Sequence, residues 1–185
     1  MGGIDKTFVE VLGLPLIVHT LRVFQASPLV GPVALVLPKE HVQRGLELAR
    51  HHGLDKVQAV CAGGARRQDS VREGLQHLPA CQWVLVHDGA RPCLDQRLIT
   101  QGLEAARETG AAVAAVPVKD TIKVVSSQGL VESTPPRDTL WAVQTPQVFR
   151  YDLLLEAHQR VTEDVTDDAS MVERLGARVK VYMGS

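Results

Sequence analysis

Short and almost entirely apolar runs recur along this chain and alternate with longer amphipathic segments. The absence of polar alternation within each run is typical of strands that are buried on both faces. These runs span residues 33–37, 57–61, 83–86, 111–116 and 179–182. The other segments carry apolar residues at helical spacing, and most open with an acidic or hydroxyl residue, which predicts helices. The predicted helices span residues 15–25, 40–52, 69–78, 95–109 and 167–175.

The alternation of buried strands with helices predicts an α/β protein with a doubly wound, mainly parallel sheet covered on both faces. One stretch breaks this pattern. Residues 121–125 and 130–133 predict two short strands joined by a polar turn, and we expect a protruding β-hairpin arm at about residues 118–148. Because an isolated hairpin is only marginally stable in water, we expect this arm to pack on a partner subunit.

The composition fits a single domain, residues 1–185, that acts on small molecules. The chain has 185 residues, of which 45% are hydrophobic and 22% are charged, and this suits one buried core. Its formal net charge of -1 argues against a nucleic-acid partner. No apolar run approaches the roughly 20 residues that span a bilayer, so we expect no membrane partner. The three cysteines lack metal-ligand spacing, and we expect a reduced, cytoplasmic protein.

Two glycine-containing turns that follow predicted strands carry groups suited to an anionic ligand. The turn 63–70 holds two arginines and leads into a helix, whose N-terminus attracts anions. In the turn 87–92, Asp88 stands where open α/β sheets bind ligands, so it can hold a divalent cation against phosphates. Arg91 can reach the same anion. Each turn also fits an ordinary capped or Asp-Gly turn, and the residues alone leave both interpretations open.

Other polar groups have weaker signals of their own. Lys6 follows Gly2-Gly3, and a glycine-rich loop before a lysine is a recurring way to bind a triphosphate. A lysine near a chain start is also commonly a solvated charge. The segment 165–170 reads first as a helix start. Cations and hydroxyls in or beside the arm suit a sugar phosphate, although they also fit a salt-bridged surface hairpin. They are Lys119, Thr121, Lys123, Arg137 and Thr145.

A series of blocks, taken in order, resembles the 2-C-methyl-D-erythritol 4-phosphate cytidylyltransferases. The blocks lie at residues 1–6, 63–70, 86–92, 117–123, 136–141, 144–149 and 166–170. The run from His87 to Pro92 and the run Thr145-Pro146-Gln147 are the most specific, and the resemblance covers essentially the whole chain. It implies a Rossmann-like nucleotidyltransferase fold and a magnesium-dependent enzyme. That enzyme would transfer CMP from CTP to the polyol phosphate in non-mevalonate isoprenoid biosynthesis and release pyrophosphate.

The resemblance also implies roles for single residues. Lys6 would bind the triphosphate and stabilise charge during transfer, and Asp88 would be the magnesium ligand. Arg137 would reach the substrate across a homodimer from the interlocked arm, which makes Lys6, Asp88 and Arg137 the expected catalytic residues. The residues implied to bind the nucleotide are Gly63, Gly64, Ser70, Asp88 and Arg91. Those implied to bind the methylerythritol phosphate are Thr121, Arg137, Thr145 and Thr166.

Some features of the family pattern are not found in this sequence. The family's first strand with its glycine-rich loop is missing, and so is a C-terminal segment with a further catalytic lysine, so we expect a chain truncated at both ends. Ala65 stands where many members have an acidic residue. Two alternatives therefore stay open: a pentitol-phosphate cytidylyltransferase, and an inactive truncated remnant. The blocks 120–123 and 136–137 favour methylerythritol phosphate over a pentitol phosphate.

Overall fold

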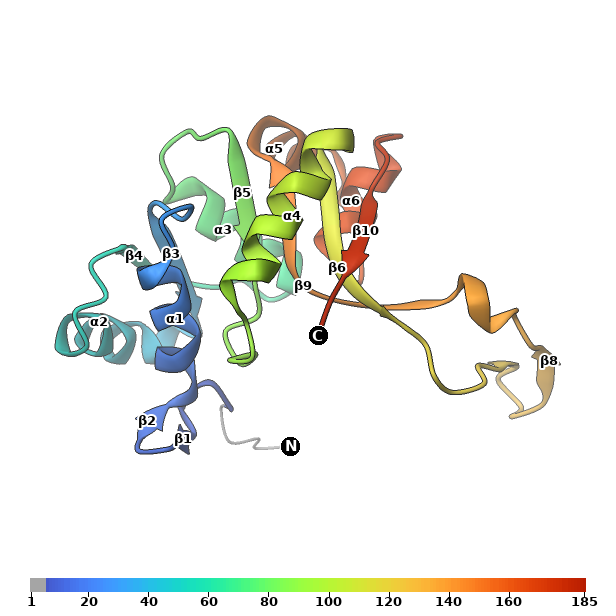
Figure 1. Cartoon of the computed structure of the whole chain (residues 1–185), viewed down its shortest axis with the longest axis horizontal. Coiled ribbons are helices and arrows are strands. Elements are labelled where there is room, and N and C mark those ends of the chain that lie inside the picture. Colours follow the sequence, from blue (N-terminus) through green and yellow to red (C-terminus); the bar gives the residue numbers. More distant parts are fainter. Residues whose placement is uncertain (1–5) are drawn as a thin grey trace.

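A four-stranded sheet and a separate parallel strand pair form the centre of the molecule (Figure 1). The computed structural model describes residues 6–185. The larger sheet has the order β10 (Lys180–Met183), β6 (Ala111–Pro117), β9 (Trp141–Arg150) and β5 (Trp83–Val86). The parallel pair consists of β3 (Val33–Leu37) and β4 (Val57–Ala62). Every apolar run that predicts a buried strand is a strand in the structure, so the α/β class is confirmed.

The larger sheet is mixed, which corrects the expectation of a mainly parallel sheet. β10 runs parallel to β6, whereas β9 runs antiparallel to both β6 and β5. The reason lies in the connection between β6 and β9. A parallel return needs a crossover, usually through a helix, but the chain comes back from β6 through the hairpin stretch without one. β9 therefore enters the sheet in the opposite direction to its neighbours.

Helices cover this sheet and the parallel pair β3–β4. They are α1 (Leu16–Ala26), α2 (Val42–His51), α3 (Arg67–Gln76), α4 (Gln96–Thr109), α5 (Tyr151–Arg160) and α6 (Asp168–Arg174). Each helix predicted from the spacing is present, and α5 is additional. No glycine, proline or capping hydroxyl separates α5 from β9, so the sequence carries no start signal there.

The period-two geometry of β6 explains how two layers of helices share one sheet. Ala112 and Ala114 are buried in a cluster with Leu98 of α4, while Ala111 and Val113 are buried on the other side with residues of α5 and α6. Successive side chains of a strand point to opposite faces, so a strand with small apolar residues throughout can be covered twice. In Figure 1, α4 lies in front of the sheet and α6 lies behind it.

The parallel pair β3–β4 has its own apolar cluster with α1 and α2. Ile17 and Leu21 of α1 pack in this cluster with Leu35 and Leu37 of β3 and with Ala49 of α2. Two short strands, β1 (Glu10–Val11) and β2 (Leu14–Pro15), and the 3-10 turns Lys6–Phe8 and Lys39–His41 complete this end of the molecule. Among the described residues, no helix has the length and apolar content that a bilayer span requires.

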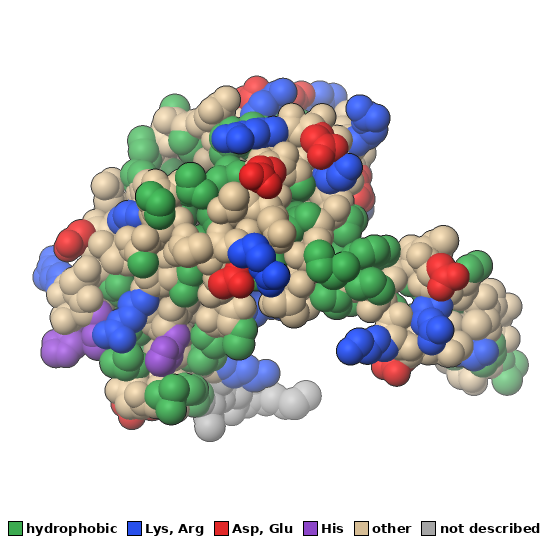
Figure 2. All heavy atoms as spheres, in the orientation of Figure 1, with side chains coloured by type: hydrophobic (Ala, Val, Ile, Leu, Met, Phe, Trp, Pro, Cys, Tyr) green, Lys and Arg blue, Asp and Glu red, His purple; other side chains and the backbone are tan. Residues whose placement is uncertain are grey.

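Residues 118–140 extend away from the body of the molecule, and we call them the arm (Figure 1). Within it, β7 (Val124–Val125) and β8 (Val131–Ser133) pair antiparallel, and the 3-10 turn Arg137–Thr139 leads back toward β9. Residues 141–148, which the sequence pattern assigns to the arm, lie in β9 of the larger sheet. Apolar side chains are visible at the root and tip of the arm in Figure 2. Those that are exposed include Ile122, Val124, Val125, Leu130, Val131, Trp141 and Val143.

Candidate active site

A pocket of about 230 Å³ lies where the ends of several elements meet. Four residues predicted to bind substrate, nucleotide or metal come together in it from distant parts of the sequence. Asp88 and Arg91 follow β5, Thr145 lies in β9, and Thr166 precedes α6. The other residues that line the pocket are Arg67, Val143, Gln144, Gln147 and Asp167.

Asp88 is held beyond the carboxyl end of β5 by contacts to both its backbone and its side chain. Its N–H donates a hydrogen bond of 3.2 Å to Oγ1 of Thr145. Its carboxylate accepts a bond of 3.0 Å from Nε of Arg91, and the Arg91 N–H donates to the Asp88 carbonyl at 3.0 Å. The Asp88 side chain is still 40% exposed. Its oxygens therefore have a fixed place and remain accessible to a ligand.

The donor set at Asp88 fits a divalent cation that is shared with phosphates. Residues 6–185 contain no group of three or more His, Cys, Asp or Glu side chains placed to hold a metal. Magnesium does not need such a group, because it commonly binds through one or two carboxylates together with water and substrate phosphates. The exposed carboxylate of Asp88 supplies that kind of ligand, and the two arginines in the same pocket can face the phosphates.

The glycine turn 63–70 packs tightly on the first turn of α3. A Cβ on Gly64 would lie 2.3 Å from Cβ of Asp69, and one on Gly63 would lie 2.6 Å from Oγ of Ser70. The Ser70 hydroxyl accepts a bond of 3.2 Å from the Gly64 N–H and donates to the Arg66 carbonyl at 3.2 Å. Only glycine allows this close approach. The predicted nucleotide residues Gly63, Gly64 and Ser70 thus form one unit, which lies outside the lining of the pocket.

The first turn of α3 also holds the loop that carries Thr166. Gln68 is buried, and its amide donates to the Glu163 carbonyl at 3.0 Å and accepts from the Val165 N–H at 3.1 Å. Arg66 donates to the Thr162 carbonyl at 3.1 Å. Unpaired backbone groups in such a place would cost about 1–3 kcal/mol each, so these contacts fix the loop. The glycine turn and the Thr166 loop are therefore mechanically connected.

Arg66 forms an ion-pair network on the surface beside this loop. Its guanidinium lies 2.8 Å from Asp69 and 2.9 Å from Asp164. The hydrogen bonds from Arg66 lower the pKa of Asp69 from its ordinary value of 3.8 to about 2. The same bonds, first with Asp69 and then with Asp164, raise the pKa of Arg66 above its ordinary value. Both groups therefore stay charged at neutral pH.

Gln147 and Asp167 join β9 to the start of α6 at the floor of the pocket. The Gln147 amide donates to Oδ2 of Asp167 at 2.9 Å, and Oδ1 of Asp167 accepts from the N–H of Ser170 at 3.0 Å. Asp167 is thus the N-cap of α6. The sequence blocks that contain Gln144, Gln147 and Asp167 are candidate segments, but the sequence predicts no binding role for these three residues. Recognition of β9 would have identified Gln147, because alternate residues of a strand face the same side as Thr145.

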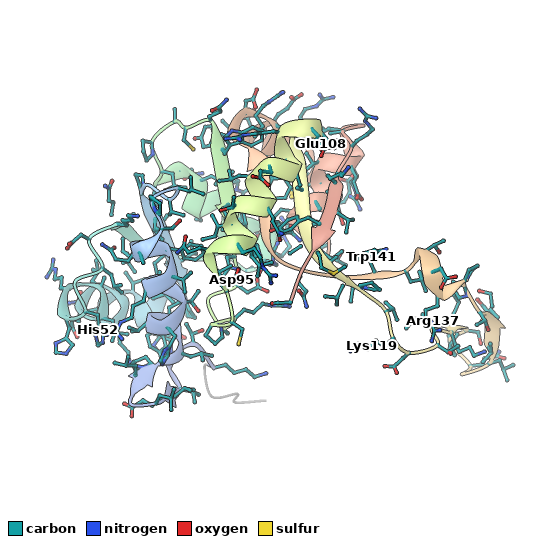
Figure 3. The ribbon with its side chains drawn as sticks, in the orientation of Figure 1. His52, Asp95, Glu108, Lys119, Arg137 and Trp141 are labelled. Atoms are coloured by element: carbon teal, nitrogen blue, oxygen red, sulfur yellow. The ribbon has the colours of Figure 1, made fainter. Side chains whose placement is uncertain are left out.

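Thr121 and Arg137 are not brought to the pocket within this chain. Both lie on the arm and are exposed, and a guanidinium N–H of Arg137 donates to the Lys119 carbonyl of the same arm at 3.0 Å. Figure 3 shows Arg137 and Lys119 on the arm, which extends away from the body of the molecule. The sequence pattern groups these residues with Thr145, but the fold separates them.

Lys6 does not line the pocket, although the residue after it approaches the Asp88 turn. It is exposed in the 3-10 turn Lys6–Phe8. The next residue, Thr7, approaches the turn, because a Cβ built on Gly89 would be 3.8 Å from the Thr7 methyl carbon. The predicted glycine-rich segment before Lys6, which includes Gly2 and Gly3, lies outside the described residues.

Comparison with known proteins decides the family. The family model described as IspD, 2-C-methyl-D-erythritol 4-phosphate cytidylyltransferase, matches residues 1–185. The chain belongs to this family. The resemblance drawn from the sequence blocks is therefore confirmed, and the pentitol-phosphate alternative is not favoured.

Individual members of the IspD family agree over most of their length. A 2-C-methyl-D-erythritol 4-phosphate cytidylyltransferase from Dehalococcoides mccartyi is 51% identical over 185 residues, which is 100% of this chain and 82% of that protein. The enzyme of that name from Clostridium novyi is 42% identical over 187 residues, with 98% of this chain and 80% of that protein covered.

Solved structures of IspD family members have the same fold. The crystal structure of 4-diphosphocytidyl-2C-methyl-D-erythritol synthase from Anaerococcus prevotii superposes with a TM-score of 0.87 at 28% identity, and it covers 100% of this chain and 83% of that chain. The 2-C-methyl-D-erythritol 4-phosphate cytidylyltransferase from Thermus thermophilus gives a TM-score of 0.79 at 36% identity, with 97% of this chain and 84% of that chain covered. The mixed sheet with helices on both faces is thus the arrangement of this family.

Proposed function

We propose that this chain transfers CMP from CTP to 2-C-methyl-D-erythritol 4-phosphate and releases pyrophosphate. Membership in the IspD family supports the reaction. The pocket in which Asp88, Arg91, Thr145 and Thr166 meet is the observation that supports the location of this reaction. A carboxylate, a cation and two hydroxyls are the groups that a metal-bound triphosphate and a polyol phosphate would require.

In this reaction the phosphate of the polyol substrate attacks the α-phosphorus of CTP in line with the leaving pyrophosphate. The attacking phosphate is already an ionised nucleophile, so no covalent enzyme intermediate is needed. The work of the protein is to position the two anions and to neutralise charge. Lys6 and Arg91 provide positive charge for the triphosphate, and the hydroxyls of Thr145 and Thr166 orient the polyol phosphate.

We propose that Asp88 holds a magnesium ion together with the phosphates of CTP. A bound magnesium ion would withdraw charge from the reacting phosphate oxygens. The chain's own contribution is to orient the Asp88 carboxylate, which Arg91 and the Thr145 hydroxyl hold in place as described above. The Gly63-Gly64 turn and Ser70 are assigned to the cytosine base, as one unit on the first turn of α3.

We also propose that the protein is a homodimer in which each arm completes the pocket of its partner. The arm has no apolar core of its own, and its exposed valines, Ile122 and Leu130 require cover. Thr121 and Arg137 lie on it far from their own pocket, so a partner's pocket is the place where they can bind the polyol phosphate. Strand β9 begins at the root of the arm and carries Thr145, which connects the two parts of the proposed site.

Two further proposals concern the fold and the location of the protein. We infer a doubly wound, Rossmann-like nucleotidyltransferase fold, which is supported by helices on both faces of the sheet and by a ligand pocket at strand ends. We also infer a cytoplasmic location. Cys61, Cys81 and Cys93 are free, and exposed free thiols such as those of Cys81 and Cys93 persist in a reducing compartment.

The test is pyrophosphate release by the purified chain with CTP and magnesium. Methylerythritol phosphate is supplied in one reaction, ribitol phosphate in a second, and a chelator is added in a third. We expect release with methylerythritol phosphate and magnesium, and at most a small fraction of that rate in the other two reactions. Faster release with ribitol phosphate would refute the substrate. No release with either polyol would refute the transferase activity of this chain.

A further inference from the structure

Asp168, at the start of α6, is a carboxylate without any exposure to solvent. Among the buried residues of the described chain, it is the one acid. Its Oδ2 accepts a hydrogen bond from the Arg67 guanidinium. Nε2 of His158 lies 3.3 Å from Oδ1, without hydrogen-bond alignment. Arg67 is therefore the hydrogen-bond donor to one oxygen of this carboxylate, and His158 lies against the other.

The surroundings of Asp168 make this pairing obligatory. α3, α5 and α6 pack together here through Leu75, Leu154 and Val172, all of which are buried. An unpaired carboxylate in such a place would cost several kcal/mol, and its attraction to a guanidinium is strong because little water screens it. Arg67 consequently has little freedom to leave Asp168.

Arg67 extends from this buried contact into the pocket. Its side chain is 35% exposed and lines the pocket, and its Nε lies 4.0 Å from Oδ1 of Asp88. A guanidinium is planar and carries several N–H donors, so a carboxylate bound at one edge leaves the others free to face a ligand. The other cation in the pocket lining, Arg91, is already bonded to Asp88 at 3.0 Å.

We propose that Arg67 binds the phosphate of the polyol substrate, and that Asp168, backed by His158, positions it for this role. The inference rests on the proposed function and adds a specificity residue to it. Within the pocket, Arg67 lies with Thr145 and Thr166, the hydroxyls assigned to the same substrate. A bidentate guanidinium suits a phosphate monoester, which presents several acceptor oxygens. The buried carboxylate removes the entropy cost of ordering the arginine when substrate arrives.

The competing interpretation is a salt bridge that only joins α3 to α6. It predicts lower stability of variants but no selective change in substrate binding. The KM values for the two substrates distinguish these interpretations. A residue that contacts the polyol phosphate affects KM for that substrate and leaves KM for CTP nearly unchanged. Lysine keeps the charge of Arg67 but cannot make the planar, two-pronged contact.

The experiment measures kcat and both KM values for wild type, Arg67→Lys and Asp168→Asn, with thermal unfolding recorded for each. Arg72→Lys is the matched control, since Arg72 is an exposed arginine of the same helix outside the pocket. We expect Arg67→Lys to raise KM for methylerythritol phosphate about tenfold or more and KM for CTP less than about twofold. Asp168→Asn should shift the values in the same direction, because it loosens Arg67. Arg72→Lys should match wild type.

Equal increases in both KM values, or lower stability with both KM values unchanged, would overturn the proposal. If Arg67→Lys does not fold, Asp168→Asn decides, because it keeps the shape of the buried group. Wild-type turnover distinguishes failure of the Arg67 role from failure of the proposed function. An active wild type beside an unaffected variant refutes the role of Arg67 alone. A wild type that does not turn over methylerythritol phosphate refutes the proposed function, and the assignment of Arg67 to that substrate with it.

Discussion

The pocket and the arm present their functional residues in opposite ways. In the pocket, Asp88 and Thr145 are fixed by a hydrogen bond between segments that are 57 residues apart in the sequence. In the arm, Thr121 and Arg137 are exposed, and the hydrogen bond that Arg137 donates to Lys119 stays within the arm. Contacts within one chain can fix the position of a side chain only where the chain forms a packed core, and the arm has none. The pocket is therefore built by the folding of one chain, whereas folding alone leaves the functional residues of the arm exposed.

Replacement of Asp88 should disable the pocket and leave the arm unchanged. Asp88→Asn removes the charge that would hold a divalent cation while it keeps the shape of the side chain. We expect kcat to fall by about 10³-fold, comparable to the loss of a main electrostatic contact in an active site. Pyrophosphate release measures it. Asp55→Asn, at an exposed position outside the pocket, serves as the control. An active Asp88→Asn variant would remove the proposed metal site.

Arg137→Ala removes the proposed phosphate contact of the arm and leaves the pocket residues unchanged. We expect kcat/KM for methylerythritol phosphate to fall by about 10²-fold, since a charged contact to phosphate is lost. Mixing this variant with Asp88→Asn tests whether the arm of one subunit serves the pocket of the other. If arms act across a dimer, mixed dimers hold one intact site, and random pairing restores roughly a quarter of wild-type activity. No recovery after subunit exchange, verified by a tagged subunit, would mean that the arm acts on its own chain.

Gly64→Ala tests the glycine turn that supports one side of the pocket. The added methyl group would lie 2.3 Å from Cβ of Asp69, so the turn must move away from α3. We expect CTP binding to weaken about tenfold, as measured by calorimetry, because the turn and Ser70 are the proposed base-reading unit. Gly31→Ala is the control, since a Cβ there meets nothing within 4 Å. Equal CTP affinity in both variants would separate the turn from nucleotide binding.

The smallest effect concerns the surface network beside the pocket and depends on pH. The folded-state pKa of Asp69 is lowered to about 2 from 3.8, so its stabilising contribution is present above about pH 4 and is lost as the pH falls through 2. We expect Asp69→Asn to be slightly less stable than wild type at pH 6, and the gap to narrow below about pH 4. Urea unfolding midpoints measure this. A gap that stays constant with pH would exclude ionisation of Asp69 as its cause.

Much of the fold follows from local sequence patterns. Apolar runs identified β3, β4, β5, β6 and β10, and helical spacing identified α1, α2, α3, α4 and α6. β9 escaped this reasoning because its polar residues Gln144, Thr145 and Gln147 interrupt the apolar pattern. Those side chains face the pocket or neighbouring caps, so their polarity reflects the site rather than exposure to solvent. The polar residues that β9 contributes to the site are therefore the reason why its sequence does not resemble a buried strand.

Asp88, Arg91, Thr145 and Thr166 could be named from the sequence because each stands in a recognisable block, and the family followed from the order of those blocks. Their meeting in one pocket could not be derived, because it depends on the antiparallel entry of β9 between β6 and β5. Arg67 shows the same limit. Its role emerges only from the contact with Asp168, 101 residues away, and from the burial of that carboxylate.

Local sequence patterns are enough to establish the α/β class, the positions of most strands and helices, and the family. These depend on periodicity, caps and turns, which act over a few neighbouring residues. The direction of β9, the separation of the arm from the pocket and the pairing of Arg67 with a buried acid follow only from the three-dimensional fold. Each of these depends on contacts between residues that are far apart in the chain, where burial and electrostatics outweigh local propensity.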